Sequence, residues 1–278
     1  MTLRLGINGA TLPAADLLTG IQAAAASGFG LYEPRIPALL EMDTPRERQI
    51  AAAALADAGL EWLPLNALED VFSTPLVDLE QTTNELCALA AGFGIHQMIA
   101  VPGAIRGEIP LQEGVDILGR LIQVAASHEV TLLYELLGFS QRAFPTLEQA
   151  RRISGGSGVQ LVLDTFHLAV SHTNADAIRQ LAAEEIGLVH LSDALTDGGS
   201  VSGVLDKDRV LPGEGGLPVQ GYIEALAAIG FRGPMSVEVF HERYRSIDPG
   251  EGARRAWASV YDLLASAGFD LGIEGSIA

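Results

Sequence analysis

Residues 160–167 read Gln-Leu-Val-Leu-Asp-Thr-Phe-His, and this stretch decides the fold class. Residues 161–163 form a short apolar run that is typical of a buried strand. The run ends in the carboxylate of Asp164, and a helical pattern follows it. Residues 131–135, Thr-Leu-Leu-Tyr-Glu, repeat this design. A short apolar strand followed by a helix is the unit from which parallel α/β folds are built.

The same unit recurs along the whole chain. Short segments rich in Val, Ile, Leu or aromatic residues alternate with longer amphipathic patterns, which indicates parallel βα units rather than hairpins. Eight strands are expected to begin near Leu3, Leu31, Glu61, Gln97, Thr131, Gln160, Gly187 and Met235. An open doubly wound sheet is the alternative, but no Gly-x-Gly-x-x-Gly follows the first strand. We therefore predict an α/β fold, a (β/α)8 barrel, with residues 1–278 as a single domain.

Composition limits the classes of function. Of the 278 residues, 48% are hydrophobic and 19% are charged, which is enough apolar material for a large core. The net charge of -18 would repel a phosphate backbone, so we expect neither a nucleic acid nor a membrane as a partner. The single cysteine, Cys87, suits a reducing compartment. Met1 leads straight into strand-like sequence without a basic signal-peptide start, so we expect a cytoplasmic protein.

Polar residues end the last four predicted strands, where a barrel of this kind builds its active site. These residues are Glu135, Asp164, His190 and Glu238. Each one alone has an ordinary explanation, such as a helix cap, an ion pair with Arg or a core histidine. Three carboxylates and an imidazole that converge in an apolar barrel would repel one another without a cation. The sequence therefore predicts one divalent metal ion, and this thiolate-free set suits Mn²⁺, Mg²⁺ or Co²⁺ and does not exclude Zn²⁺.

A metal ion bound to a carbonyl and an adjacent hydroxyl stabilises the enediolate that forms when a neighbouring carbon loses its proton. Such a site predicts isomerisation, epimerisation or dehydration of a small polyol or sugar ketone. Glu135 and Glu238 are the candidate acid and base. His167 follows Asp164 at the end of the sixth strand and is a candidate substrate contact, with a hydrogen bond to a metal ligand as the alternative.

Further candidate substrate contacts lie in loops and at earlier strand ends. Arg209 lies in a long Gly- and Asp-rich stretch between Ala194 and Pro218, on the face expected to be catalytic. Glu33, Arg35 and Asn66 end the second and third strands and suit substrate hydroxyls, with capping or salt bridging as the alternative. The glycines near Arg209 do not have the spacing of a phosphate loop, and no nucleotide cofactor is expected.

Several motifs resemble the xylose-isomerase-like sugar isomerase and epimerase superfamily of TIM barrels, and most of all its inosose (2-keto-myo-inositol) isomerases. The motifs are Leu65-Asn66-Ala67-Leu68, Val101-Pro102, residues 161–167, His190-Leu191-Ser192-Asp193, residues 208–215 and Ser236-Val237-Glu238-Val239-Phe240. The resemblance implies that Glu135, Asp164, His190 and Glu238 hold the metal and that Glu135 and Glu238 transfer protons. It also implies that His167 and Arg209 contact the substrate, and that no redox cofactor is used.

Other members of the superfamily stay open as alternatives. Residues 241–242 are His-Glu where inosose isomerases tend to carry Arg-Pro, so a ketose 3-epimerase, a dehydroshikimate dehydratase or a C-glycoside-cleaving enzyme also fits. An abasic-site endonuclease would need further His ligands at earlier strand ends, where Glu33 and Asn66 stand. A non-enzymatic metabolite-binding barrel is opposed by the presence of both catalytic glutamates. No coiled-coil pattern appears, and the sequence makes no prediction of oligomeric state.

Overall fold

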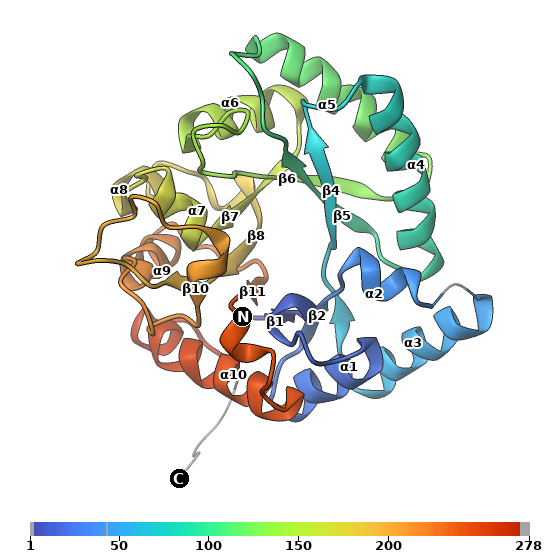
Figure 1. Cartoon of the computed structure of the whole chain (residues 1–278), viewed down its shortest axis with the longest axis vertical. Coiled ribbons are helices and arrows are strands. Elements are labelled where there is room, and N and C mark those ends of the chain that lie inside the picture. Colours follow the sequence, from blue (N-terminus) through green and yellow to red (C-terminus); the bar gives the residue numbers. More distant parts are fainter. Residues whose placement is uncertain (1–2, 43, 273–278) are drawn as a thin grey trace.

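The computed structural model describes residues 3–42 and 44–272, so both ends of the predicted 1–278 domain lie outside the described residues. Parallel strands in the centre are ringed by helices (Figure 1). The strands of this sheet are β1 (Leu5–Asn8), β2 (Leu31–Glu33), β3 (Glu61–Trp62), β4 (Leu65–Val71), β5 (Gln97–Pro102), β6 (Thr131–Glu135), β7 (Gln160–Asp164), β8 (Ile186–Leu191) and β11 (Met235–Val237). The helices are α1 (Leu17–Ala26), α2 (Ile36–Leu40), α3 (Pro45–Asp57), α4 (Leu76–Gly92), α5 (Leu111–Ala126), α6 (Leu147–Ser157), α7 (Thr165–Val170), α8 (Ala175–Ile178), α9 (Val219–Ala228) and α10 (Pro249–Ser266).

The nine strands of the sheet make an eight-stranded barrel because the third strand is interrupted. The hydrogen-bonded order runs β3-β2-β1-β11-β8-β7-β6-β5-β4, so the two halves of the third strand stand at its two ends. Pro64 lies between these halves and has no N–H to donate to the ladder. β3 pairs with β2 and β4 pairs with β5, while a parallel bridge between Arg35 and Asn66 joins the end of β2 to β4. The predicted barrel is confirmed, and its first strand begins at Leu5 rather than Leu3.

Alternation along the strands separates the barrel interior from the core beneath the helices. Tyr134 and Leu163 belong to the large cluster between the sheet and the helices. Their strand neighbours point the other way, into the barrel. We call the buried residues there the interior apolar layer: Leu31, Leu63, Ala67, Ile99, Leu133, Val162 and Leu188. Because residues two apart share a face, Glu135, Asp164 and His190 lie above Leu133, Val162 and Leu188.

Local sequence fixes where the outer helices begin. Thr44 and Glu47 form a capping box at the start of α3, and Thr146 with Gln149 does the same for α6. Asp16 caps α1 by accepting a hydrogen bond from the amide of Thr19 at 2.8 Å. The first and last long helices, α1 and α10, pack side by side and complete the ring (Figure 1). In the described part of the chain, none of the helices combines the length and apolar composition needed to cross a bilayer.

Candidate metal centre and active site

Four potential metal ligands converge at the carboxyl ends of neighbouring strands. Glu135 ends β6, Asp164 ends β7, His190 lies near the end of β8, and Glu238 directly follows β11. All four are buried, and one donor atom of each lies within 4.8 Å of those of the other three. The sequence predicted these residues as a set, and the fold brings them together.

His190 is held between carboxylates on both sides of its ring. Its Nδ1 lies 3.1 Å from Glu135 Oε1 and 3.5 Å from Glu238 Oε2. Its Nε2 lies 3.0 Å and 3.1 Å from the two carboxylate oxygens of Glu33. The Nδ1 edge of the imidazole therefore faces the cluster, and the Nε2 edge faces away from it.

Burial and charge shift the pKa values of the cluster strongly. Burial raises the pKa of Glu238 to about 8, and it also raises that of Glu135. Burial alone would lower the pKa of His190, but the carboxylates of Glu238, Glu33 and Glu135 hold it well above its ordinary value. A carboxyl group with a pKa of about 8, as at Glu238, indicates more negative charge than the site balances by itself. A divalent cation would displace those protons, so the donor set fits such a group.

Arg209 brings the nearest permanent positive charge. It is 1% exposed, and its Nη1 donates to Asp164 Oδ2 at 2.5 Å while its Nε donates to Asp206 Oδ1 at 3.1 Å. Its Nη2 donates to His167 Nε2 at 3.1 Å, and its guanidinium carbon lies 4.3 Å from the ring centroid of Phe166. Burial would lower the pKa of Arg209, but Asp164 and Asp206 raise it. The guanidinium therefore stays charged next to the cluster.

His167 is a neutral imidazole in this environment. Burial and the charge of Arg209 lower its pKa to about 4. Because Nε2 accepts a hydrogen bond from Arg209, the ring hydrogen resides on Nδ1, which has no partner among the described residues. The pair of His167 and Arg209, predicted as substrate contacts, thus lies together beside Asp164.

The long loop that carries Arg209 is anchored by Asp193. This loop contains the short antiparallel pair β9 (Asp193–Ala194) and β10 (Arg209–Val210). The Asp193 carboxylate accepts hydrogen bonds from the backbone amides of Ala194, Gly213, Gly215 and Leu217, at 2.7 to 3.2 Å. A side chain at Gly215 would clash with the Ala194 carbonyl. Asp193 therefore fixes the Pro-Gly-Glu-Gly segment next to the strand pair that carries Arg209.

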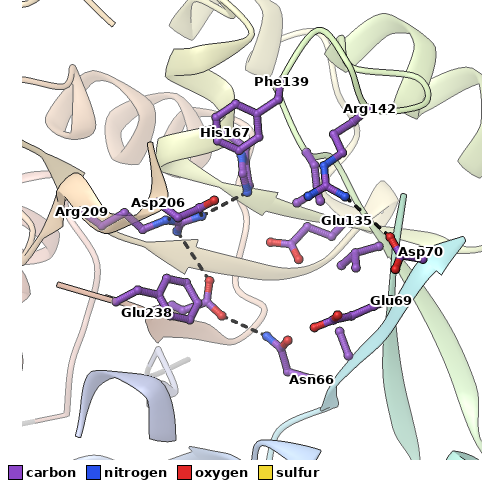
Figure 2. A pocket seen from close by; sticks show the side chains of 14 residues that line it. Asn66, Glu69, Asp70, Glu135, Phe139, Arg142, His167, Asp206, Arg209 and Glu238 are labelled. Atoms are coloured by element: carbon purple, nitrogen blue, oxygen red, sulfur yellow. Dashed lines mark hydrogen bonds and ion pairs between the residues drawn. The ribbon is translucent and has the colours of Figure 1, made fainter. Parts of the chain in front are cut away.

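A cavity of about 440 Å³ opens directly above the cluster. It is lined by Asn66, Ala67, Glu69, Asp70, Val101, Glu135, Leu137, Phe139, Arg142, His167, Asp206, Arg209, Glu238 and Phe240. Figure 2 shows Arg209 and Arg142 approaching Glu135 from different sides. Arg142 donates to the carbonyl of Pro102 at 3.2 Å and lies 3.9 Å from Asp70.

The residues predicted at the ends of the second and third strands have different positions. Asn66 lines the cavity, and its Nδ2 donates to Glu33 Oε1 at 2.9 Å and to Glu238 Oε1 at 3.0 Å. Arg35 is exposed outside the cavity lining, 6.0 Å from the ring centroid of Phe240. Glu33 is fully buried with both oxygens on His190, so the structure leaves it no surface for the predicted substrate contact.

Other residues at the site were not singled out from the sequence. Asn8 ends β1, and its Nδ2 donates to Glu238 Oε1 at 3.0 Å. The strand-end rule that identified Glu135 would have found Asn8 as well. Phe139 and Arg142 lie in the loop after β6, where no periodic pattern marks them. The loop after a strand lies at the carboxyl-terminal face of the barrel, and this position was the signal that could have identified them.

Comparison with known proteins assigns the family. The model of the xylose isomerase-like TIM barrel family matches residues 21–270. The chain belongs to this family. Membership in the xylose isomerase-like TIM barrel family confirms the resemblance predicted from the motifs.

Individual relatives in sequence differ in activity. An inosose isomerase of Bacillus subtilis (strain 168) is 30% identical over 180 residues, which cover 62% of this chain and 64% of the relative. The chain therefore matches just under two thirds of the length of that protein. A 3-dehydroshikimate dehydratase of Pseudomonas aeruginosa is 32% identical over 134 residues, which cover 47% of this chain and 21% of the relative.

A solved structure shares the fold of this xylose isomerase-like chain over nearly its full length. The crystal structure of the IOLI protein with a binding zinc atom superposes with a TM-score of 0.86 at 24% identity. The match covers 95% of this chain and 99% of that one. The zinc atom is a property of that protein.

Proposed function

We propose that this chain is a divalent-metal-dependent isomerase that moves a ketone along a polyol ring, with 2-keto-myo-inositol as its substrate. The observation that carries the proposal is the convergence of Glu135, Asp164, His190 and Glu238 in one buried cluster, of which Glu135 and Glu238 line a cavity of about 440 Å³. The similarity to a Bacillus inosose isomerase supports the choice of substrate.

The four converging side chains would hold the cation. Carboxylate oxygens and one imidazole nitrogen suit Mn²⁺, Mg²⁺, Co²⁺ or Zn²⁺. When bound, the cation supplies positive charge that stabilises the negative charge of an enediolate.

Glu135 and Glu238 are the proposed proton-transfer groups. Both line the cavity, so each carboxylate can reach a bound substrate. One carboxylate removes the proton from the carbon next to the ketone, and the other delivers a proton to the former ketone carbon. The hydroxyl proton moves to the other oxygen, so the ketone shifts by one ring position. Arg209 contributes positive charge beside the reacting oxygens, and His167 holds its guanidinium in place.

The charges around the cavity favour an uncharged substrate. Glu69, Asp70 and Asp206 are exposed carboxylates in the cavity lining. Arg209 is already bound to buried partners, and Arg142 lies near Asp70. A ring that carries a carboxylate, as dehydroshikimate does, would meet these acidic groups, and the two arginines in the described lining already contact Asp164 and Asp70. This arrangement supports a polyol ketone over a dehydratase substrate.

Proton NMR of the purified, Mn²⁺-supplemented protein with 2-keto-myo-inositol in D₂O tests the proposal. We expect a new ketone isomer and deuterium at the carbon next to the carbonyl. Both signals should disappear with a chelator and return with excess Mn²⁺. No change in the substrate would contradict the proposal, and deuterium exchange at C3 of a ketose would then favour a 3-epimerase.

A further inference from the structure

Glu33 lies outside the cavity lining and contacts one of the four ligands, His190, through both of its carboxylate oxygens. We propose that Glu33 is a positioning residue that fixes the tautomer and the orientation of the His190 ring. This inference rests on the metal site of the proposed function. It replaces the substrate-binding role that the sequence suggested for Glu33.

The two ring nitrogens of His190 have distinct partners. Nε2 lies 3.0 Å and 3.1 Å from the two oxygens of Glu33, whereas Nδ1 lies 3.1 Å from Glu135 Oε1 within the cluster. An imidazole that coordinates a cation through one nitrogen carries its hydrogen on the other nitrogen. With a cation bound, His190 would present its Nδ1 lone pair to the cation and donate its Nε2 hydrogen to Glu33.

The surroundings of Glu33 keep this contact in a single geometry. The side chain is fully buried, so water does not compete for its oxygens. Asn66 Nδ2 donates to Glu33 Oε1 at 2.9 Å and also lies 3.0 Å from Glu238 Oε1. Glu33 thus connects the end of β2 with two cluster members, His190 directly and Glu238 through Asn66. Loss of its carboxylate would leave the Nε2 hydrogen of His190 buried without an acceptor.

Metal affinity measures this role without any substrate. We would titrate metal-free protein with Mn²⁺ and follow free Mn²⁺ by electron paramagnetic resonance. Glu33→Ala should weaken Mn²⁺ binding by about 10- to 100-fold, the usual cost of losing the partner of a metal-bound histidine. Glu33→Gln keeps a carbonyl acceptor and should fall between Glu33→Ala and the wild type. Glu61→Gln, an exposed carboxylate paired with Arg4 at the start of β3, should bind within about twofold of the wild type.

A second measurement uses the wild type alone, so it does not depend on the folding of a variant. Nitrogen-15 NMR of the histidine rings in Zn²⁺-loaded protein should show the His190 ring with Nδ1 bound to metal and Nε2 carrying hydrogen. Metal on Nε2 would overturn the inference, as would unchanged Mn²⁺ affinity in folded Glu33→Ala. A wild type that binds no Mn²⁺ would overturn the proposed metal site as well. Weakened Mn²⁺ binding by Glu33→Ala, in a protein that does not convert the inosose, would support the inference and reject only the proposed substrate.

Discussion

The interior apolar layer and the candidate metal centre lie on the same strands, but one is apolar and the other is charged. In the interior apolar layer, Leu133, Val162 and Leu188 are fully buried side chains. Two residues further along, the same strands carry Glu135, Asp164 and His190 of the candidate metal centre. The apolar layer excludes water beneath the charges, which strengthens their interactions. Burial raises the pKa of Glu238, in the same cluster, to about 8. A single step along each strand therefore separates the part that stabilises the barrel from the part that carries chemistry.

The largest effect is expected when one proposed acid/base group is removed from the candidate metal centre. Glu135→Gln keeps the size of the side chain but cannot transfer a proton, so turnover should fall by about 10²- to 10⁴-fold. Deuterium incorporation by NMR measures this, with circular dichroism to check the fold. Glu148→Gln, an exposed carboxylate on α6, is the matched control and should keep wild-type turnover. Near-wild-type activity of Glu135→Gln would reject its role in proton transfer.

A substitution in the interior apolar layer should reduce stability and leave the four candidate metal ligands in place. Leu133→Ala removes a fully buried side chain and should lower the free energy of unfolding by about 2–5 kcal/mol. Urea unfolding measures this loss, and Mn²⁺ titration should still give one ion per chain. Leu40→Ala, at a side chain that is 59% exposed, should change stability by less than about 0.5 kcal/mol. Equal losses at both positions would mean that the interior layer is not a separate source of stability.

A smaller effect concerns the pH dependence of stability. The pKa of His167 is about 4 in the folded protein, below its ordinary value of 6.5. The unfolded chain therefore takes up a proton between pH 6.5 and 4 that the folded chain does not. Stability should fall as the pH drops through this window, and His167 should contribute up to about 1.4 kcal/mol per pH unit.

Urea unfolding of metal-free protein across this window checks the prediction. His167→Gln should lose stability less steeply than the wild type as the pH falls. His128→Gln, outside the cavity after α5, should keep the wild-type slope. Parallel curves for the wild type and His167→Gln would contradict a neutral, buried His167.

The sequence predicts the barrel and the four-residue cluster because both depend on strand ends. An apolar run that stops at Asp164 has a defined end, and the fold then brings such ends together. The role of Glu33 was not predictable in this way, because a strand-end position does not tell whether a side chain faces the cavity or another ligand. Arg142 was missed because loop residues have no periodicity that places them. Pro64, in contrast, was a visible signal for the split third strand.

The Asp193 anchor has a consequence for how substrate would be held. Four backbone amides bound to one carboxylate fix the loop before any substrate arrives. The conformational entropy of placing Arg209 is then lost during folding rather than at each encounter. For the proposed ketone substrate, the guanidinium would be a preorganised binding group, and binding energy from the substrate would be directed to the reacting carbons.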